Sequence, residues 1–294
     1  MYSLSDGMAA IQTVDFFPPI IDDPFKYGRI AAATALSDIY AMGAKPHLVM
    51  NLLCFNTAEL PLEVAADILA GGADAIIESG AILVGGQTME DNIPKYGLCV
   101  TSFYPADKIL TNAGARTGDV IILTKAIGTA VIMGANRADV ASEEEMNITI
   151  DQMCRLNKYA VEAVEDLEVH SCTDITGFGL IGHALEMAEA SRVTIEIDYD
   201  SVPKLPRADF LAKEGFSPCQ AHTNLAFVND RLYAEGVEPH KLALLAEPQT
   251  SGGLLFSLPA DAAETALSRL KNHDPDSAII GRVDEKSNHV IRIV

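Results

Sequence analysis

Asp38 stands in surroundings that require its carboxylate to find a partner. It is the only charged residue between Arg29 and Lys45, in a stretch of alanine, leucine, isoleucine and methionine with the composition of a buried helix. Burying an unpaired carboxylate is costly, so the group needs a metal ion, a cation or a hydrogen-bonded loop. The positions one turn before it carry small side chains, which leaves room for another body beside the carboxylate. Asp38 therefore binds a ligand or caps a neighbouring loop.

Asp174 is a second candidate. It lies in residues 172–179, where an acid and two threonines lead into a glycine turn at the start of a helical pattern. Backbone N–H groups at the start of a helix attract anions, and the acid could hold the metal ion of such an anion. An ordinary helix cap uses the same residue types, so both interpretations stay open.

The same segment matches a dinucleotide-binding pattern. Gly177, Gly179 and Gly182 have the G-x-G-x-x-G spacing, and Asp198 and Asp200 follow about 20 residues later. That pattern needs an apolar strand before its first glycine, whereas the residues before Gly177 are polar. A nicotinamide-dependent enzyme is therefore kept as an outside alternative.

Two glycine-containing segments and a third acid complete the set of candidates. Residues 85–88 (Gly-Gly-Gln-Thr) lie between two strand patterns, where paired glycines permit close approach to a ligand or form a tight turn. Residues 247–253 have the same two interpretations. Asp15 ends the first strand pattern. Asp15, Asp38 and Asp174 together have the composition of a Mg²⁺–nucleotide site, because Mg²⁺ prefers a few carboxylates plus phosphate oxygens.

The charge balance restricts the partners of this chain. It has 294 residues, with 21 Lys+Arg against 41 Asp+Glu and a formal net charge of −20. Nucleic-acid backbones and anionic membranes need clustered positive charge, so we expect neither as a partner. An anionic ligand would need a divalent metal ion to supply the missing positive charge.

The cysteines and the apolar segments indicate a cytoplasmic protein. The five cysteines are scattered and never form a C-x-x-C pair, which argues against a zinc site or a disulfide framework. The sequence has no run of 18 apolar residues, and its first residues lack the pattern of a signal peptide.

Strand and helix patterns mix along the whole chain. In the first part, strands are expected at 9–16, 47–55, 81–84 and 96–103, and helices at 27–42 and 61–79. A polar stretch at 105–118 predicts a boundary between a domain of residues 1–106 and one of residues 107–294. In the second, strands are expected at 119–124, 193–197, 254–258 and 278–283, helices at 151–167, 178–190 and 261–270, and breaks at Pro203, Pro206 and Pro218. The fold class is α/β or α+β.

An ordered set of short motifs resembles selenophosphate synthetase (selenide, water dikinase). Each motif is weak alone, but together they span nearly the whole chain in the right order. The segments that carry the resemblance are 13–17, 22–24, 35–43, 45–46, 85–88, 94–98, 173–179 and 248–254.

The resemblance implies a two-domain fold of the aminoimidazole ribonucleotide synthetase type. It also implies a homodimer built through N-terminal strands, and the reaction of ATP, selenide and water to selenophosphate, AMP and phosphate. By motif, Asp15 would contact ATP, Asp38 would bind ATP and Mg²⁺, and Asp174 would bind Mg²⁺. Gly86, Gln87 and Thr88 would reach ATP held mainly by the other subunit. Such a site works by positioning and charge neutralisation, with metal ions bridging carboxylates and phosphates.

The sequence departs from the family pattern at two places. Gln87 stands where many members have histidine, and an amide can donate hydrogen bonds but cannot titrate. The family's catalytic cysteine or selenocysteine, a lysine and another aspartate would lie before Met1. No residue of this chain is therefore assigned the catalytic role, and we expect the 294-residue chain alone not to make selenophosphate.

Two further alternatives stay open. One is another ATP-binding member of the same superfamily, such as a thiamine-phosphate kinase or a purine-pathway synthetase. The other is a non-catalytic paralogue that binds nucleotide, which the absence of the nucleophile and lysine would suit.

Overall fold

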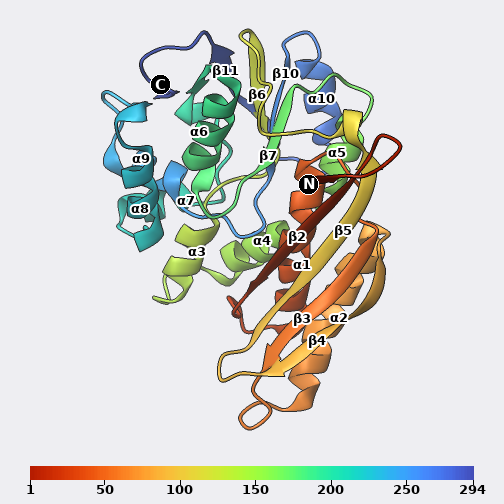
Figure 1. The fold of residues 1–294 in the computed structure, drawn as a ribbon. Coiled ribbons are helices and arrows are strands. Elements are labelled where there is room, and N and C mark those ends of the chain that lie inside the picture. The colour runs from red at the N-terminus through yellow and green to blue at the C-terminus, as the bar shows by residue number, and fades with distance from the viewer. The chain divides into compact units, whose positions relative to one another are not determined.

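The structure is a computed structural model that describes all of residues 1–294, and the chain divides into two compact units (Figure 1). The first unit consists of Met1–Ile109 and Met153–Lys158. The second consists of Leu110–Gln152 and Tyr159–Val294. None of the helices is both long and apolar enough to cross a membrane.

The first unit is a five-stranded sheet with two long helices on one side of it (Figure 1). The strand order is β1-β2-β5-β3-β4, and only the β3–β4 pair is parallel. The strands are β1 (Tyr2–Ser3), β2 (Met8–Phe17), β3 (Leu48–Phe55), β4 (Ile82–Glu90) and β5 (Lys95–Pro105). The helices are α1 (Pro24–Ala41) and α2 (Leu62–Ser79), and a 3₁₀ turn covers Ala106–Lys108.

Helix α1 carries Asp38 and is buried along most of its length, which confirms the helix expected at 27–42. Its start is defined by Pro24 in the first turn and by Asp23, whose side chain accepts a hydrogen bond from the Lys26 backbone N–H. A Cβ at Gly28 would collide with the Ile68 carbonyl oxygen of α2, so the glycine lets the two helices approach closely. This packing holds Asp38 on the side of α1 that faces the sheet, where it contacts Thr13 of β2.

The opposite face of the first sheet is apolar and exposed. Val14 on β2 is 56% exposed, and Ile82 on β4 is 64% exposed. The other large apolar side chains exposed on β2, β3, β4 and β5 are Phe16, Leu48, Met50, Val84, Met89 and Phe103. Leu83 is also exposed, but it pairs with the buried Val49 in the cross-strand row of Thr13, on the helix side. Every residue of β4 is exposed. Contiguous apolar patches of this kind mark interaction surfaces.

The structure corrects the loop expected at residues 85–88. These residues lie inside β4, which stays paired with β3 as far as Glu90 opposite Phe55. The register shifts between the Leu83 and Gly85 pairs, which is a β-bulge. Gly85 and Gly86 have φ values of 144° and 157°, so they carry the strand through the irregularity without ending it.

The second unit is built on a seven-stranded sheet of order β7-β10-β6-β11-β8-β12-β9. Its strands are β6 (Asp119–Leu123), β7 (Ser171–Asp174), β8 (Thr194–Ile197), β9 (Leu232–Tyr233), β10 (Leu254–Pro259), β11 (Ala278–Asp284) and β12 (Ile291–Ile293). The only parallel pairs are β12–β8 and β12–β9, and the other pairs are antiparallel. The strands expected near 119–124, 193–197, 254–258 and 278–283 are all present.

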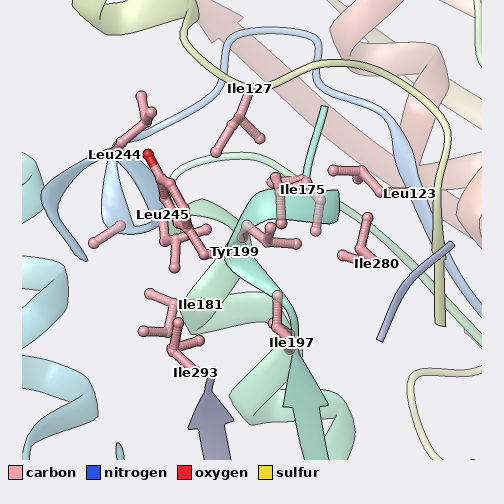
Figure 2. Close-up of a cluster of buried hydrophobic side chains, with 14 of the residues drawn as sticks. Leu123, Ile127, Ile175, Ile181, Ile197, Tyr199, Leu244, Leu245, Ile280 and Ile293 are labelled. Atoms are coloured by element: carbon pink, nitrogen blue, oxygen red, sulfur yellow. The ribbon is translucent and has the colours of Figure 1, made fainter. Parts of the chain in front are cut away.

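Eight helices accompany this sheet: α3 (Thr129–Asn136), α4 (Glu143–Cys154), α5 (Lys158–Val164), α6 (Gly179–Ser191), α7 (Ala208–Lys213), α8 (Cys219–Val228), α9 (Pro239–Ala246) and α10 (Ala263–Leu270). Two 3₁₀ turns cover Tyr199–Ser201 and Asn229–Arg231. Figure 2 shows a core in which side chains of β6, β8, β11 and β12 meet those of α6 and α9. Leu123, Ile197 and Leu245 are members of this cluster.

One expectation for the second unit is wrong. The single helix expected at 151–167 is two helices, because the chain leaves the helical path after Cys154 to bury Leu156 and Asn157 in the first unit. There Asn157 Nδ2 donates a 2.8 Å hydrogen bond to Ser37 Oγ. The polar residues before Gly177 include strand β7 (Ser171–Asp174), which the sequence analysis did not list among its strands.

The strand order excludes the dinucleotide-binding interpretation of the glycine pattern. That fold needs a mostly parallel sheet in which the strand before the glycines and the next strand form one unit. Here β7 is an edge strand that runs antiparallel to β10, and three strands separate it from β8. The helix after Gly177 therefore belongs to a different architecture.

Candidate functional site

Two of the expected site residues, Asp15 and Asp38, lie on facing elements of the first unit. Thr13 Oγ1 on β2 donates a hydrogen bond to Asp38 Oδ2 on α1. Side chains alternate along a strand, so Thr13 and Asp15 point to the same face, about 7 Å apart along β2. Their cross-strand partners, Val100 and Leu98, are buried under the helices. Asp15 and Asp38 therefore share the helix-covered side of the sheet, and both are half-buried.

Two buried tyrosines tie together the strands around these acids. The Tyr27 hydroxyl donates to the Phe17 carbonyl oxygen at the end of β2 and accepts from the Tyr96 backbone N–H at 2.8 Å. Tyr96 Oη donates to Asn51 Oδ1 at 2.8 Å. Burial raises the pKa of both phenols above their ordinary value, so they remain neutral donors.

Gly86, Gln87 and Thr88 do not join the two acids within one chain. Gly86 stands in the same cross-strand row as Asp15, three strands away, which is about 14 Å at ordinary strand spacing. Gln87 is in register with Leu52, in the row of Phe16, so its side chain points to the apolar outer face. Its amide nitrogen donates a hydrogen bond to the Thr88 carbonyl oxygen at 3.0 Å.

Asp174 lies in the second unit at the end of β7 and is 7% exposed. The residues after it hydrogen-bond to the loop before β10: Ile175 N–H donates to Gly253 O, and Gln249 N–H donates to Thr176 O, both at 2.9 Å. The two motifs at 173–179 and 248–254 are therefore side by side. Cys172 is fully covered, and burial, with a smaller contribution from the Asp174 charge, raises the pKa of its thiol.

The loop before β10 is anchored by a buried carboxyl group. Glu247 Oε2 accepts from the Val131 backbone N–H at 2.7 Å at the start of α3, and Glu247 Oε1 accepts from Gln249 Nε2 at 2.6 Å. Gln249 Oε1 accepts from Thr129 Oγ1 at 3.0 Å. Burial raises the pKa of Glu247 to about 8, against the opposing effect of these hydrogen bonds. Glu247 and Gln249 thus have a structural role, which is one of the two interpretations of this segment.

Three polar residues near the expected site were not singled out from the sequence. Thr13 contacts Asp38. Lys125 is 1% exposed and donates from Nζ to the Ser251 carbonyl oxygen at 3.1 Å. A signal for Lys125 exists in the sequence, since it is a lone cation directly after an apolar strand pattern. The contacts of Thr13 and Ser251 depend on tertiary packing and leave no such signal.

The structure contains no group of three or more histidine, cysteine or acidic side chains that could hold a metal ion. Asp15 and Asp38 belong to the first unit and Asp174 to the second.

Both halves of the chain match models of one protein family. Residues 1–103 match the N-terminal domain, and residues 116–294 the C-terminal domain, of AIR synthase related proteins. A selenide, water dikinase of Clostridium botulinum (strain Eklund 17B / Type B) is 46% identical over 295 residues, which cover 100% of this chain and 85% of that protein. The chain belongs to the selenide, water dikinase family. A second member, from Porphyromonas gingivalis (strain ATCC 33277), is 48% identical over 283 residues and covers 96% of this chain and 81% of that protein.

Solved structures confirm the fold expected for this family. The thiamine-monophosphate kinase of Stenotrophomonas maltophilia K279a aligns with a TM-score of 0.73 at 17% identity, covering 99% of this chain and 86% of that one. E. coli HypE, a hydrogenase maturation protein, aligns with a TM-score of 0.74 at 18% identity, covering 97% and 82%. Both are similar in fold alone. The dikinase family is distinguished from them by sequence, since its members are more than twice as similar to this chain.

Proposed function

We propose that this chain acts in the ATP-dependent synthesis of selenophosphate from selenide and water, with release of AMP and phosphate. The observation that supports this function is the 46% identity to a selenide, water dikinase along the whole chain. The five cysteines are free thiols, which suits a reducing compartment, and we place the reaction in the cytoplasm.

We propose that Asp15 contacts ATP, Asp38 binds ATP and Mg²⁺, and Asp174 binds Mg²⁺. The donor set fits this ion, because carboxylate oxygens together with phosphate oxygens are its preferred ligands. When bound, Mg²⁺ would neutralise the negative charge of the phosphates, because this chain has an excess of acidic residues and a net charge of −20. The hydrogen bond from Thr13 to Asp38 Oδ2 fixes the orientation of this carboxylate.

The active form proposed here is a homodimer that buries the outer face of the first sheet. That face is apolar and includes Val14 and Ile82, and a second copy of the same face would cover it. In one chain Gln87 points away from the side that carries Asp15. In the proposed dimer, residues 86–88 would instead contact ATP that is held mainly by the other subunit.

Nucleotide binding is the direct test of these residues. We expect calorimetry on the full chain to show ATP binding that requires Mg²⁺, and no binding of NAD(H). Phosphorus NMR with ATP and selenide under reducing conditions would show whether AMP and phosphate form together. Failure of the folded, dimeric chain to bind ATP in the presence of Mg²⁺ would contradict the proposed function.

A further inference from the structure

His183 is held at both of its ring nitrogens. It lies on α6 and is 8% exposed. Its Nε2 is 3.2 Å from Thr176 Oγ1, and its Nδ1 is 3.2 Å from Glu186 Oε2, about one helical turn further along. The Phe178 ring packs against the imidazole, with 5.6 Å between the ring centroids. The imidazole is therefore fixed between a hydroxyl group and a carboxylate.

The carboxylate decides which nitrogen of His183 carries the hydrogen. An ionised carboxylate only accepts hydrogen bonds, so Nδ1, which faces Glu186, is the N–H donor. In a neutral imidazole the other nitrogen is then an acceptor. Nε2 therefore accepts from Thr176, whose hydroxyl hydrogen points at the ring. The Thr176 oxygen has only lone pairs left for a further partner, which must be a hydrogen-bond donor or a cation.

The Thr176 hydroxyl does not cap the helix that follows it. A threonine at the start of a helix ordinarily accepts from a backbone N–H of the first turn. Helix α6 begins without a side-chain cap, and the Thr176 hydroxyl bonds to His183 instead. The backbone of Thr176 is fixed separately, since its carbonyl oxygen accepts from the N–H groups of Gln249 and Gly179 at 2.9 and 3.1 Å. The hydroxyl is therefore oriented without stabilising the helix end, which favours a role in binding.

Thr176 also lies close in the chain to the acid proposed to bind Mg²⁺. It follows Asp174, the last residue of β7, by two positions, which is at most about 7 Å between the Cα atoms. Ile175 is buried, whereas Thr176 is half-buried. Thr176 is therefore the first side chain after β7 that reaches solvent at this end of the strand. In P-loop proteins a serine or threonine hydroxyl holds Mg²⁺ together with an aspartate, so this pair of residue types suits the ion.

We propose that Thr176 Oγ1 is a direct ligand of the Mg²⁺ ion that Asp174 binds, and that His183 and Glu186 are positioning residues for this oxygen. A cation suits the oxygen better than a phosphate group does, because a phosphate oxygen would need the hydrogen that Thr176 directs at His183. The assignment rests on the proposed binding of ATP–Mg²⁺ by this chain. It adds to that site one uncharged oxygen ligand and two residues that orient it.

The test measures the affinity of the full chain for ATP by calorimetry in the presence of Mg²⁺. We expect Thr176→Val, which keeps the shape but lacks the oxygen, to lower the affinity at least about tenfold, and Thr176→Ser to retain most of it. His183→Phe keeps an aromatic ring but has no acceptor, so it should lower the affinity by a smaller factor. His240→Phe on α9 is the matched control, because His240 Nε2 also faces a carboxylate, 3.8 Å from Asp209 Oδ1. That control should leave the affinity unchanged, and melting temperatures verify that each variant is folded.

Exchange of the metal ion separates a ligand from a structural residue. Thr176→Cys replaces the hydroxyl oxygen by sulfur, a soft ligand that prefers a soft ion such as Cd²⁺ to Mg²⁺. The ratio of the ATP affinity in Cd²⁺ to that in Mg²⁺ should therefore rise at least about tenfold over the ratio for the unmodified chain. The five cysteines of the unmodified chain are present in both proteins, so their own contribution is included in this baseline.

The outcomes separate the role of Thr176 from the proposed function. If the unmodified chain shows no Mg²⁺-dependent ATP binding, both fall. If it binds ATP with Mg²⁺ but Thr176→Val binds equally well, the proposed function stands and Thr176 is not a ligand. If Thr176→Cys gains no preference for Cd²⁺, the assignment of Thr176 as a metal ligand is likewise wrong.

Discussion

Thr13 on β2 and Asp38 on α1 are joined by a hydrogen bond from the threonine hydroxyl to Asp38 Oδ2. The contact links the first long strand to the buried helix, and it orients the one carboxylate that this helix carries. Because Asp15 lies two residues further along the same face of β2, the orientation of Asp38 and the position of Asp15 are coupled through the strand.

Thr13→Val should weaken ATP–Mg²⁺ binding more than it weakens folding. Valine keeps the shape of threonine but loses the donor, and a hydrogen bond to a charged group is worth about 1.5–3 kcal/mol, or roughly tenfold or more in affinity. Calorimetry measures the affinity, and Thr13→Ser should restore most of it. Thr194→Val, which removes a buried threonine hydroxyl from β8, is the control for a general loss of stability. An unchanged affinity in folded Thr13→Val contradicts this role.

Asp38→Asn and Asp174→Asn should each lower the affinity for ATP–Mg²⁺ at least about tenfold, since even the outer partners of metal ligands are worth about 10- to 100-fold. Asparagine fits the same space, and at Asp38 its amide oxygen can still accept from Thr13. Urea denaturation should therefore show a smaller effect than calorimetry. Asp230→Asn, at an exposed position, is the matched control. Equal nucleotide affinity in all three variants would show that neither Asp38 nor Asp174 contributes to ATP–Mg²⁺ binding.

The sequence shows clearly those features that depend on local pattern. A single acid in an apolar helix identified Asp38, and the helix itself was predicted from its composition of alanine, leucine, isoleucine and methionine. The continuation of β4 through residues 85–88 was not predictable, because pairing with β3 outweighs the turn preference of two glycines. Strand β7 escaped notice because an edge strand of four residues can be polar when its hydrogen bonds go to β10.

The acids of the site could be predicted from the sequence, but their polar contacts could not. Thr13 meets Asp38 across 25 positions and Lys125 meets Ser251 across 126, so both contacts depend on the completed fold. The positive φ of Ser251 (51°) was likewise not predictable, because the two glycines that follow it are the residue type expected at such a conformation. The family resemblance, by contrast, used the order of many short motifs and needed no tertiary contact.

Val14→Lys should convert the dimer to a monomer. Val14 is 56% exposed on the outer face of the first sheet, and a charge buried there in both copies would be desolvated without a partner. Light scattering at micromolar concentration measures the mass. Ile77→Lys is the control, since Ile77 is 77% exposed but lies on α2, which packs on the other side of the sheet. A monomeric mass for the unmodified chain would exclude the proposed dimer.

Glu247 should make the stability of the second unit depend on pH. Burial raises its pKa to about 8 in the folded chain, above the value near 4.3 expected in the unfolded chain. Between these two values the folded state binds the extra proton, so the free energy of unfolding falls as pH rises from about 5 to about 8. The total loss is up to a few kcal/mol, on the scale of about 1.4 kcal/mol for each unit of pKa difference.

Glu247→Gln should remove this dependence. The glutamine amide oxygen can accept from the Val131 backbone N–H as the protonated carboxyl group does, and it does not titrate. Urea denaturation between pH 5.5 and about 8.5 should therefore show the variant overtaking the unmodified chain in stability as pH rises. Glu264→Gln, at an exposed position of α10, provides the baseline for any other titrating groups. Parallel stability curves for Glu247→Gln and the unmodified chain would show that Glu247 is ionised throughout, held by the backbone donors at the start of α3.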